Sequence, residues 1–447
     1  MSIFRAYDVR GLYPNELDER MMGRIGKAFA TYTRYDTVAV GCDVRLSSPA
    51  LKDALIKGLV SCGVTVFDVG MVTTPMLYYA RAFLECEGAM MVTASHNPPE
   101  YNGVKMCKGG FAMSPDEIQV IPRLISEGVY RKGKGEVFAR DILAQYVESL
   151  KAQITLERKL KIVIDGGNGT AGPVAERIFR EMGCEVICIY CQPDGNFPNH
   201  MPDPMVAENI SDLKSKVIVY NADIGIAYDG DGDRVRFVDE RGNELYGDEA
   251  LALLARDVLW KKKGAKVLCD VTCSKMLIDD VKRHGGVPVV SRTGHTFIRR
   301  RMIEEMIPIA GEVSGHVYYY DVGFDDGIFA SLKMVESLSG KMNKKLSDMR
   351  ATLPVYFSTP SIKIPCDDNE KFSVIENLKK DFSKEYDVIT IDGVRVEFDD
   401  GWGLVRASNT EPILSVRFEA KTQKRLSEIV DIFREKMAKQ RVYFTLN

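Results

Sequence analysis

The segment Leu160-Lys161-Ile162-Val163-Ile164-Asp165 is an apolar run that ends in an aspartate, and a polar loop and a helical pattern follow it. The same arrangement starts again at Thr37 and at Ala265. In each copy the helical pattern stops at a glycine and a second apolar run follows; the three glycines are Gly63, Gly183 and Gly285. Glycine is the usual residue just past a helix, because it adopts the left-handed conformation without steric cost. Strand, helix and strand form a βαβ unit, which indicates a parallel sheet.

The three copies are too far apart for a solenoid, whose repeats span roughly 20–50 residues. From about Pro354 the pattern changes to helical stretches and three short strand-like runs, with Asp392-Gly393 as a hairpin turn. The sequence therefore predicts three tandem, topologically similar α/β domains with mixed or parallel sheets and a smaller C-terminal α+β domain, arranged around a central cleft. The expected boundaries are 1–150, 151–248, 249–353 and 354–447.

The charge balance excludes several classes of partner. The 447 residues include 60 Lys and Arg and 63 Asp and Glu, which gives a formal net charge of −3. Such a chain has no overall field that would attract nucleic acid or an anionic membrane. It has no apolar run of about 18 residues and no signal-peptide core. We expect a soluble cytoplasmic protein that binds neither nucleic acid nor membrane.

A serine beside a histidine is the first candidate for chemistry. It lies in Thr93-Ala94-Ser95-His96-Asn97-Pro98-Pro99, and Lys105 follows shortly after. A serine in a proline-stiffened loop next to an imidazole is a candidate nucleophile. The alternative is a turn held by side-chain hydrogen bonds. No Gly-x-Ser-x-Gly motif surrounds Ser95, so an α/β-hydrolase serine is not expected.

Three aspartates at alternate positions form the second candidate, Asp229-Gly230-Asp231-Gly232-Asp233-Arg234. Residues two apart in an extended loop point the same way, so these carboxylates can converge on a hard cation such as Mg²⁺ or Ca²⁺. An EF-hand is rejected because Arg234 stands where glycine is required and because the flanks, 217–220 and 235–238, are predicted as strands. An aspartyl-phosphate phosphatase remains open on this segment alone.

Two further loops suit a sugar phosphate. Gly311-Glu312-Val313-Ser314-Gly315-His316 places a carboxylate, a hydroxyl and an imidazole within six residues, and His295 lies just upstream. Such groups can hydrogen-bond several hydroxyls of one sugar. The segment Arg406-Ala407-Ser408-Asn409-Thr410 combines a guanidinium with hydroxyls and an amide, which suits a phosphate. Either loop alone could be an ordinary turn.

Together the four loops resemble those of the α-D-phosphohexomutases, and within that family the phosphomannomutase/phosphoglucomutase group. The opening Phe4-Arg5-Ala6-Tyr7-Asp8-Val9-Arg10-Gly11 is also similar, and the resemblance covers essentially the whole chain. It implies an isomerase of carbohydrate metabolism that moves a phosphoryl group between the 1- and 6-positions of mannose or glucose phosphates. The implied route passes through a phosphoserine and a hexose 1,6-bisphosphate, which also serves as activator.

The resemblance implies roles for individual residues. Ser95 would carry the phosphoryl group, surrounded by Arg10, His96, Lys105 and Arg234. Mg²⁺ would be bound by Ser95, Asp229, Asp231 and Asp233. The sugar would contact Glu312, Ser314, His295 and His316. The non-reacting phosphate would contact Arg406, Ser408, Asn409 and Thr410, and Tyr7 would be a further substrate contact.

This chain also departs from the family pattern. Members of the group often carry lysine two residues after the equivalent of Asp270, where this chain has Thr272; Lys275 could supply the cation if its helix points it inward. Cys42 replaces a commoner arginine. The alternatives kept open are a phosphoglucosamine mutase, an Mg-dependent aspartyl-phosphate phosphatase and a silent sugar-phosphate-binding protein. The resemblance leaves open whether the protein is a monomer or a homodimer.

Overall fold

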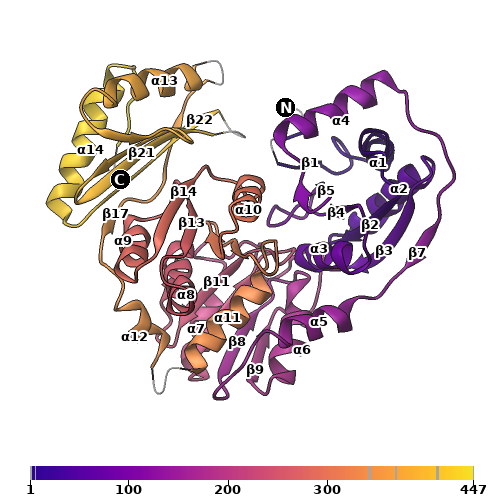
Figure 1. The fold of residues 1–447 in the computed structure, drawn as a ribbon, viewed down its shortest axis with the longest axis horizontal. Coiled ribbons are helices and arrows are strands. Elements are labelled where there is room, and N and C mark those ends of the chain that lie inside the picture. The colour runs from indigo at the N-terminus through magenta and orange to yellow at the C-terminus, as the bar shows by residue number, and fades with distance from the viewer. Residues whose placement is uncertain (1–2, 6, 341–343, 368–369, 409–411, 446–447) are drawn as a thin grey trace.

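The computed structural model describes residues 3–5, 7–340, 344–367, 370–408 and 412–445. It contains four units, each built on its own sheet. The N-terminal unit and the C-terminal unit lie at opposite ends of the molecule, and the two middle units join them (Figure 1). In this part of the chain, no helix combines the length and the apolar character that crossing a bilayer requires.

The first unit is a seven-stranded sheet with the strand order β1-β5-β4-β2-β3-β7, and β6 pairs with β5. Its strands are β1 (Val9–Leu12), β2 (Thr37–Cys42), β3 (Thr65–Met71), β4 (Gly88–Val92), β5 (Tyr101–Lys108), β6 (Phe111–Ala112) and β7 (Val137–Ala139). Its helices are α1 (Glu19–Thr33), α2 (Ser48–Val60), α3 (Thr74–Phe83) and α4 (Pro115–Glu127), and α5 (Leu143–Lys151) leads to the second unit.

The second unit has the strand order β12-β11-β10-β8-β9 and the third has β14-β13-β15-β16. The second contains β8 (Lys161–Asp165), α6 (Ala171–Glu181), β9 (Glu185–Ile189), α7 (Ser211–Val219), β10 (Ile224–Tyr228), β11 (Val235–Asp239) and β12 (Glu244–Leu245). The third contains α8 (Gly247–Lys261), β13 (Lys266–Asp270), α9 (Lys275–Arg283), β14 (Val287–Ser291), α10 (His295–Glu304), β15 (Ile309–Gly311), β16 (Val317–Tyr319), α11 (Gly327–Ser339) and α12 (Leu346–Arg350).

These three sheets share one topology. A central strand, β2, β8 or β13, pairs in parallel with two neighbours. One of those neighbours, β4, β10 or β15, then pairs antiparallel with the strand that follows it. The prediction of three similar α/β domains with mixed sheets is confirmed. The loops that carry Ser95, the three aspartates and Glu312 all lie at the same place, between the last parallel strand and the antiparallel one.

The predicted strand at 217–220 is wrong, because these residues close helix α7. Their β-branched side chains favour a strand by local propensity. In the structure, Leu213 and Val217 are fully buried one helical turn apart, whereas Ile218 and Val219 are exposed. Packing with helical periodicity therefore overrides local propensity. The strands that flank the aspartate loop are β10 and β11, so the rejection of an EF-hand stands.

The fourth unit is a six-stranded sheet with the order β17-β22-β21-β20-β19, and β18 pairs with β22. It contains β17 (Phe357–Ser358), β18 (Ile362–Pro365), α13 (Lys371–Phe382), β19 (Asp387–Ile389), β20 (Val394–Phe398), β21 (Gly401–Ala407), β22 (Ile413–Ala420) and α14 (Gln423–Ala438). The sequence predicted β19, β20 and β22 and missed the other three. One of these is β21, whose Gly401-Trp402-Gly403 start weakens the strand signal.

The hydrophobic core of the fourth unit is separate from that of the other three. One continuous buried cluster runs through the first three units, whereas the fourth has a core of its own. A small cluster, Val271, Trp402 and Leu404, joins the third and fourth units. The fourth unit is thus attached to the others by a much smaller apolar contact than those that hold them together.

Helices α1 and α2 of the first unit cross at glycines, which gives a prediction about stability. A Cβ at Gly58 would lie 2.3 Å from the Gly23 carbonyl oxygen, which is backbone and cannot turn aside. Gly58→Ala would gain about 1 kcal/mol of helix propensity, but we expect the clash to outweigh it. A net destabilisation of about 1–2 kcal/mol should appear in chemical denaturation. Gly110→Ala is the control, because its nearest neighbour is 3.9 Å away; equal stability of the two variants would contradict the prediction.

Candidate active site

Ser95 lies in a strained loop held by a buried arginine. Its φ is +51°, in the left-handed region, and the residue is 2% exposed. The guanidinium of Arg45 is fully buried and donates to the carbonyl oxygens of Ser95 (2.9 Å), Asn97 (2.6 Å) and Tyr101 (3.0 Å). Asp43 pairs with Arg45 at 3.1 Å. In the sequence, the only signal of this clamp is a charged pair, Asp43 and Arg45, directly after a buried strand.

The three aspartates of the β10–β11 loop converge with Ser95. Carboxylate oxygens of Asp229, Asp231 and Asp233 lie within 4.8 Å of one another, and all three residues are buried. The Ser95 hydroxyl donates to Asp229 Oδ2 at 2.8 Å. Lys105 Nζ, from β5, donates to Asp231 Oδ2 at 2.7 Å and also to Asp233. The predicted nucleophile and the predicted metal ligands thus form one cluster.

Burial controls the electrostatics of this cluster. Desolvation and the neighbouring Asp233 and Asp231 raise the pKa of Asp229 well above its usual range. Burial opposes the charge of Lys105, but Asp231 and Asp233 outweigh it and raise the pKa of the ammonium. Lys105 therefore stays charged and balances only part of the negative charge.

The donor set fits a divalent cation. Asp231 Oδ1 and Asp233 Oδ1 are buried and have no hydrogen-bond partner within the described ranges. Buried acceptors are rarely left unpaired, because the lost hydration is costly. Carboxylate oxygens are the ligands that Mg²⁺ prefers. The unpaired oxygens therefore mark the side of the cluster on which a cation would be held.

The side chains of His96, Arg10 and Arg234 lie close to the serine loop and the aspartates. His96 Nδ1 lies 3.1 Å from Ser95 Oγ. The charge of Arg234, followed by burial, lowers the pKa of His96 well below its usual value, so the imidazole is neutral. Arg10 donates to Asn97 Oδ1 at 2.6 Å in the same loop. Arg234 Nε lies 3.9 Å from Asp229 Oδ2.

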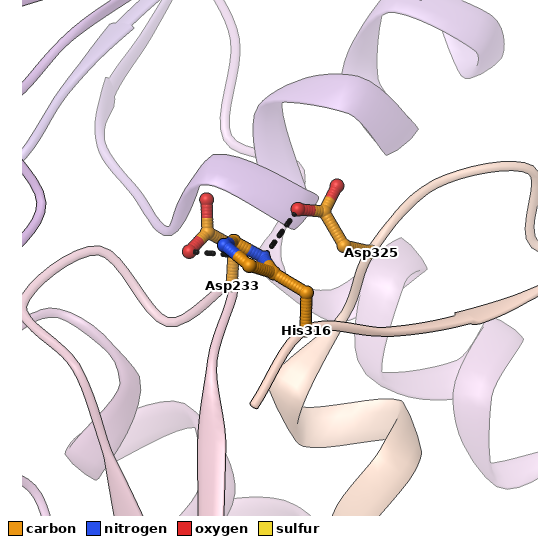
Figure 2. Close-up of side chains that lie close together, drawn as sticks. All are labelled: Asp233, His316 and Asp325. Atoms are coloured by element: carbon orange, nitrogen blue, oxygen red, sulfur yellow. Dashed lines mark ion pairs between the residues drawn. The ribbon is translucent and has the colours of Figure 1, made fainter. Parts of the chain in front are cut away.

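His316 connects the aspartate loop (229–234) to the loop 311–316, which is the predicted sugar-binding loop, or sugar loop (Figure 2). Its Nδ1 lies 2.8 Å from Asp325 Oδ2 and 3.7 Å from Asp233 Oδ1. Burial lowers the pKa of His316, but Asp233 and Asp325 outweigh burial and raise it to about 9. Arg234 Nε lies 3.0 Å from Nε2. That contact is a hydrogen bond only in the neutral form of His316, whereas the raised pKa favours the charged form, in which both ring nitrogens carry protons. No motif in the sequence marks Asp325, which is 1% exposed.

The sugar loop borders a cavity of about 1150 Å³ between the second, third and fourth units. Ser314 lines it, and its buried hydroxyl has no partner within the described residues. Glu312 is 3% exposed and lies behind this wall. It accepts from the Tyr318 hydroxyl at 2.8 Å and from the Gly294 N–H at 3.1 Å. Ser314 therefore lies closer to a ligand in this cavity than the carboxylate of Glu312 does.

The other predicted sugar contacts stack beside this loop. The rings of His295 and His316 lie 6.1 Å apart, and Tyr7 packs edge-on against His295 at the same separation. Tyr7 comes from the first unit and its hydroxyl donates to the Thr293 carbonyl at 3.3 Å. Burial lowers the pKa of His295 to about 4. The three rings bridge the first and third units.

The predicted phosphate loop begins near the end of β21. Arg406 lines the cavity, and its Nη2 lies 3.1 Å from Asp392 Oδ2. The Ser408 N–H donates to the Ile413 carbonyl at 3.0 Å and closes the base of the loop. Asn409 and Thr410 lie outside the described residues.

The geometry near Asp270 bears on the departure at Thr272. Lys275 Nζ lies 3.7 Å from Asp279 on its own helix, and Lys275 is not among the described residues that line the cavity. Thr272 does line the cavity, but its hydroxyl donates to Asp270 Oδ2 at 2.6 Å. Lys275 therefore does not supply the cation that Thr272 lacks.

Comparison with known proteins agrees with this geometry. Four models of phosphoglucomutase/phosphomannomutase match in order: alpha/beta/alpha domain I (1–132), domain II (144–242), domain III (246–356) and the C-terminal domain (362–436). A phosphomannomutase/phosphoglucomutase from Pseudomonas aeruginosa is 43% identical over 98% of this chain and 95% of that protein. A phosphoglucomutase from Neisseria gonorrhoeae is 42% identical over 97% and 96% of the two chains.

The fold agrees as well. A crystal structure of a phosphoglucomutase/phosphomannomutase family protein from Burkholderia thailandensis superposes with a TM-score of 0.94 at 40% identity, covering 99% of each chain. These similarities confirm the predicted family and favour a mutase over the phosphatase and silent-binding alternatives. With the acidic cluster, the clamped serine and the four matched domains in one continuous chain, the protein belongs to the phosphoglucomutase/phosphomannomutase family.

Proposed function

We propose that this enzyme interconverts the 1- and 6-phosphates of glucose and mannose, with Ser95 as the phosphoryl carrier and a hexose 1,6-bisphosphate as intermediate. One observation carries the proposal: the Ser95 hydroxyl donates to Asp229 at 2.8 Å inside the cluster of three carboxylates. Arg234 contacts that cluster and also lines the cavity that extends to Arg406. The cavity therefore runs from a residue that contacts the acidic cluster to the first residue of the predicted phosphate loop.

Each transfer is a direct exchange of phosphoryl acceptors. The bond between phosphorus and Ser95 Oγ breaks while a bond to a hexose hydroxyl oxygen forms, and the second transfer reverses this at the other end of the sugar. When Ser95 is the acceptor, its hydroxyl proton has two acceptors in reach, Asp229 Oδ2 at 2.8 Å and His96 Nδ1 at 3.1 Å. The neutral state of His96 keeps its nitrogen available for that proton.

Asp229, Asp231 and Asp233, with an oxygen of phosphorylated Ser95, would hold Mg²⁺. A divalent cation bound there neutralises charge on the phosphoryl oxygens, which is the main requirement of phosphoryl transfer. Arg10, Lys105 and Arg234 add positive charge around the same point, and Arg45 fixes the serine loop. Water must be kept out, because a phosphoserine exposed to it would be hydrolysed.

We further propose that the units end near residues 150, 248 and 353, and that the fourth unit closes over bound substrate. Its separate core and its small contact with the third unit support this. The partners we propose are small hexose phosphates. The net charge of −3 supports an enzyme without nucleic acid or membrane partners. We propose that it is cytoplasmic and works as a monomer or a homodimer.

Removing the carrier hydroxyl should stop the reaction. We expect Ser95→Ala to lower kcat by at least about 1,000-fold, because no other oxygen can form the covalent intermediate. Mass spectrometry of the wild-type protein should map the phosphate to Ser95, as an ester stable in acid. Phosphate on Asp229, or near-full activity of Ser95→Ala, would contradict the proposal.

Removing a carboxylate should weaken metal binding. We expect Asp231→Asn to raise the Mg²⁺ concentration needed for half-maximal activity by about tenfold or more, since loss of an outer-shell partner alone costs about 10–100-fold. Mg²⁺ should also raise the melting temperature of the wild type, by mass action, but not that of the variant. Asp431→Asn is the control, because Asp431 is exposed on α14 and pairs only with Arg434 among the described residues. An unchanged Mg²⁺ requirement in Asp231→Asn would reject the site.

The sugar loop predicts the substrate range. Glucose and mannose differ only at C2, whereas the proposed contacts, Glu312 and Ser314, are expected to bind O3 and O4. We therefore expect similar kcat/KM for the two 1-phosphates and a much lower value for glucosamine 1-phosphate, because Val313 offers no hydrogen bond to an amine. The test is kcat/KM for all three under one condition. A glucosamine value above the others would reverse the assignment.

A further inference from the structure

Arg45, which clamps the Ser95 loop, uses every hydrogen-bond donor of its guanidinium. Its Nε donates to Asp43 at 3.1 Å. Its two terminal nitrogens donate to four backbone carbonyl oxygens, those of Ser95, Asn97, Pro98 and Tyr101. A guanidinium has five N–H donors, and all of them lie in its plane. The two faces of the group carry no donor, so only a stacking contact can hold them.

An aromatic ring of the second unit makes such a contact. Arg45 Cζ lies over the ring of Phe197, 5.2 Å from the ring centroid. A cation within about 6 Å of a ring centroid is attracted by the negative face of the ring. Arg45 is 0% exposed and Phe197 is 3% exposed, so water competes little for this contact. The attraction is therefore stronger than it would be at the surface.

The loop that carries the ring, between β9 and α7, also touches the backbone beside Arg45. A Cβ on Gly195 would lie 2.5 Å from the Val44 carbonyl oxygen and 2.7 Å from the Leu46 nitrogen. A glycine is needed where two backbones come this close. The loop of the second unit thus contacts the first unit on both sides of Arg45, while Phe197 contacts its side chain.

The backbone of Phe197 is held in an unusual conformation. Its φ is +49°, in the left-handed region that a bulky residue seldom adopts. Its N–H donates to the Asp194 carbonyl oxygen at 3.0 Å. Strained backbone of this kind persists only where the surrounding structure fixes it, and it gathers at functional sites. The position of the ring is therefore enforced by its own loop.

The same loop is fixed to the aspartate loop of the second unit. Asn168 Nδ2 donates to the Gln192 carbonyl oxygen at 2.9 Å, and the Asn168 carbonyl accepts from the Asp194 N–H at 2.9 Å. Two residues further on, the Thr170 N–H donates to the Gly230 carbonyl oxygen at 3.1 Å. A short series of backbone contacts therefore connects the ring to the loop that carries the three aspartates.

We infer that Phe197 is a positioning residue for the nucleophile: it holds the guanidinium of Arg45 from the second unit and so fixes Ser95 opposite the aspartates of that unit. The inference rests on the proposed function and adds a residue that no motif marks. Phe197 is not among the described residues that line the cavity, so it acts through Arg45. Phosphoryl transfer depends mainly on positioning and charge, so a small shift of the serine is costly.

The alternative is that Phe197 only fills space between the first two units. In that case loss of the ring lowers the stability of the protein, but each folded molecule keeps its full turnover rate. The effect of the substitution is then also independent of Arg45. The two roles therefore differ in kcat and in the coupling between the two residues.

The test compares Phe197→Leu with Phe197→Tyr in the full chain. Leucine removes the ring and stays apolar, whereas tyrosine keeps the ring. Arg45→Lys, alone and combined with Phe197→Leu, completes a double-mutant cycle on kcat. Calorimetry with glucose 1-phosphate in a Ser95→Ala background, where no turnover occurs, gives the affinity and the fraction of molecules that bind. Each kcat is corrected for that fraction.

The matched control is Phe382→Leu in the fourth unit. Phe382 is fully buried, and Lys436 Nζ lies over its ring at 5.7 Å from the centroid. The control therefore also removes a buried ring beside a cation, but it does so away from the serine. It should lower the melting temperature and leave the corrected kcat unchanged.

We expect Phe197→Leu to lower the corrected kcat by about 10- to 100-fold, since a small misplacement of a reacting group costs that much. The KM and the calorimetric affinity for glucose 1-phosphate should stay within about twofold of the parent, because the proposed substrate contacts lie elsewhere. Phe197→Tyr should keep most of the kcat. In the Arg45→Lys background, Phe197→Leu should lower kcat little further, because the ring acts through the guanidinium.

Two results would overturn the inference: an unchanged corrected kcat in Phe197→Leu, or losses that multiply in the double variant, which is the signature of independent packing. Failure of the proposed function looks different. In that case the wild type does not turn over hexose phosphates, and the Ser95→Ala parent does not bind glucose 1-phosphate, whatever residue stands at 197.

Discussion

Asp229, Asp231 and Asp233 repel one another, and the surrounding structure has to compensate for that repulsion. Three carboxylates within 4.8 Å cannot be buried together unless opposite charges and donors surround them. The first unit supplies these groups: the Lys105 ammonium, the Ser95 hydroxyl and the Thr74 hydroxyl, which donates to Asp231 at 2.6 Å. The cluster is complete only when two units meet, and their continuous core explains why the nucleophile is held so closely to the acids.

The repeated topology places functional residues in the equivalent loop of each of the first three units. In each of the first three units the chain leaves a buried parallel strand, makes a short loop and returns antiparallel beside it. A loop in that position is anchored at both ends by sheet hydrogen bonds, so its ends are held firmly. The residues at its tip can still differ from one unit to the next. One such loop carries Ser95, the next carries the aspartates and the third carries Ser314. In the fourth unit Arg406 comes instead from a hairpin between two antiparallel strands, β21 and β22.

The sequence predicted what local pattern and residue chemistry encode. The glycine stops hold, since Gly63, Gly183 and Gly285 all have φ near +80°, and the serine and aspartate motifs do converge. It missed contacts between segments distant in the chain. Arg45 lies about 50 residues before the loop it clamps, and the pairing of Asp325 with His316 depends on a return of the chain that no local pattern reveals. Residues 217–220 show the same limit, because packing rather than propensity decided their helix.

The small contact of the fourth unit has an energetic meaning. The groups proposed to bind the non-reacting phosphate lie on that unit, whereas the reacting serine lies on the first. A ligand that spans the cavity would contact both, so binding energy at the remote phosphate could support the proposed closure of the fourth unit. Energy used in that way organises the site and excludes water rather than holding the substrate more tightly. If the fourth unit closes as proposed, a larger apolar interface would keep it closed without substrate and would hinder the bisphosphate from exchanging its ends, so a small interface suits that mechanism.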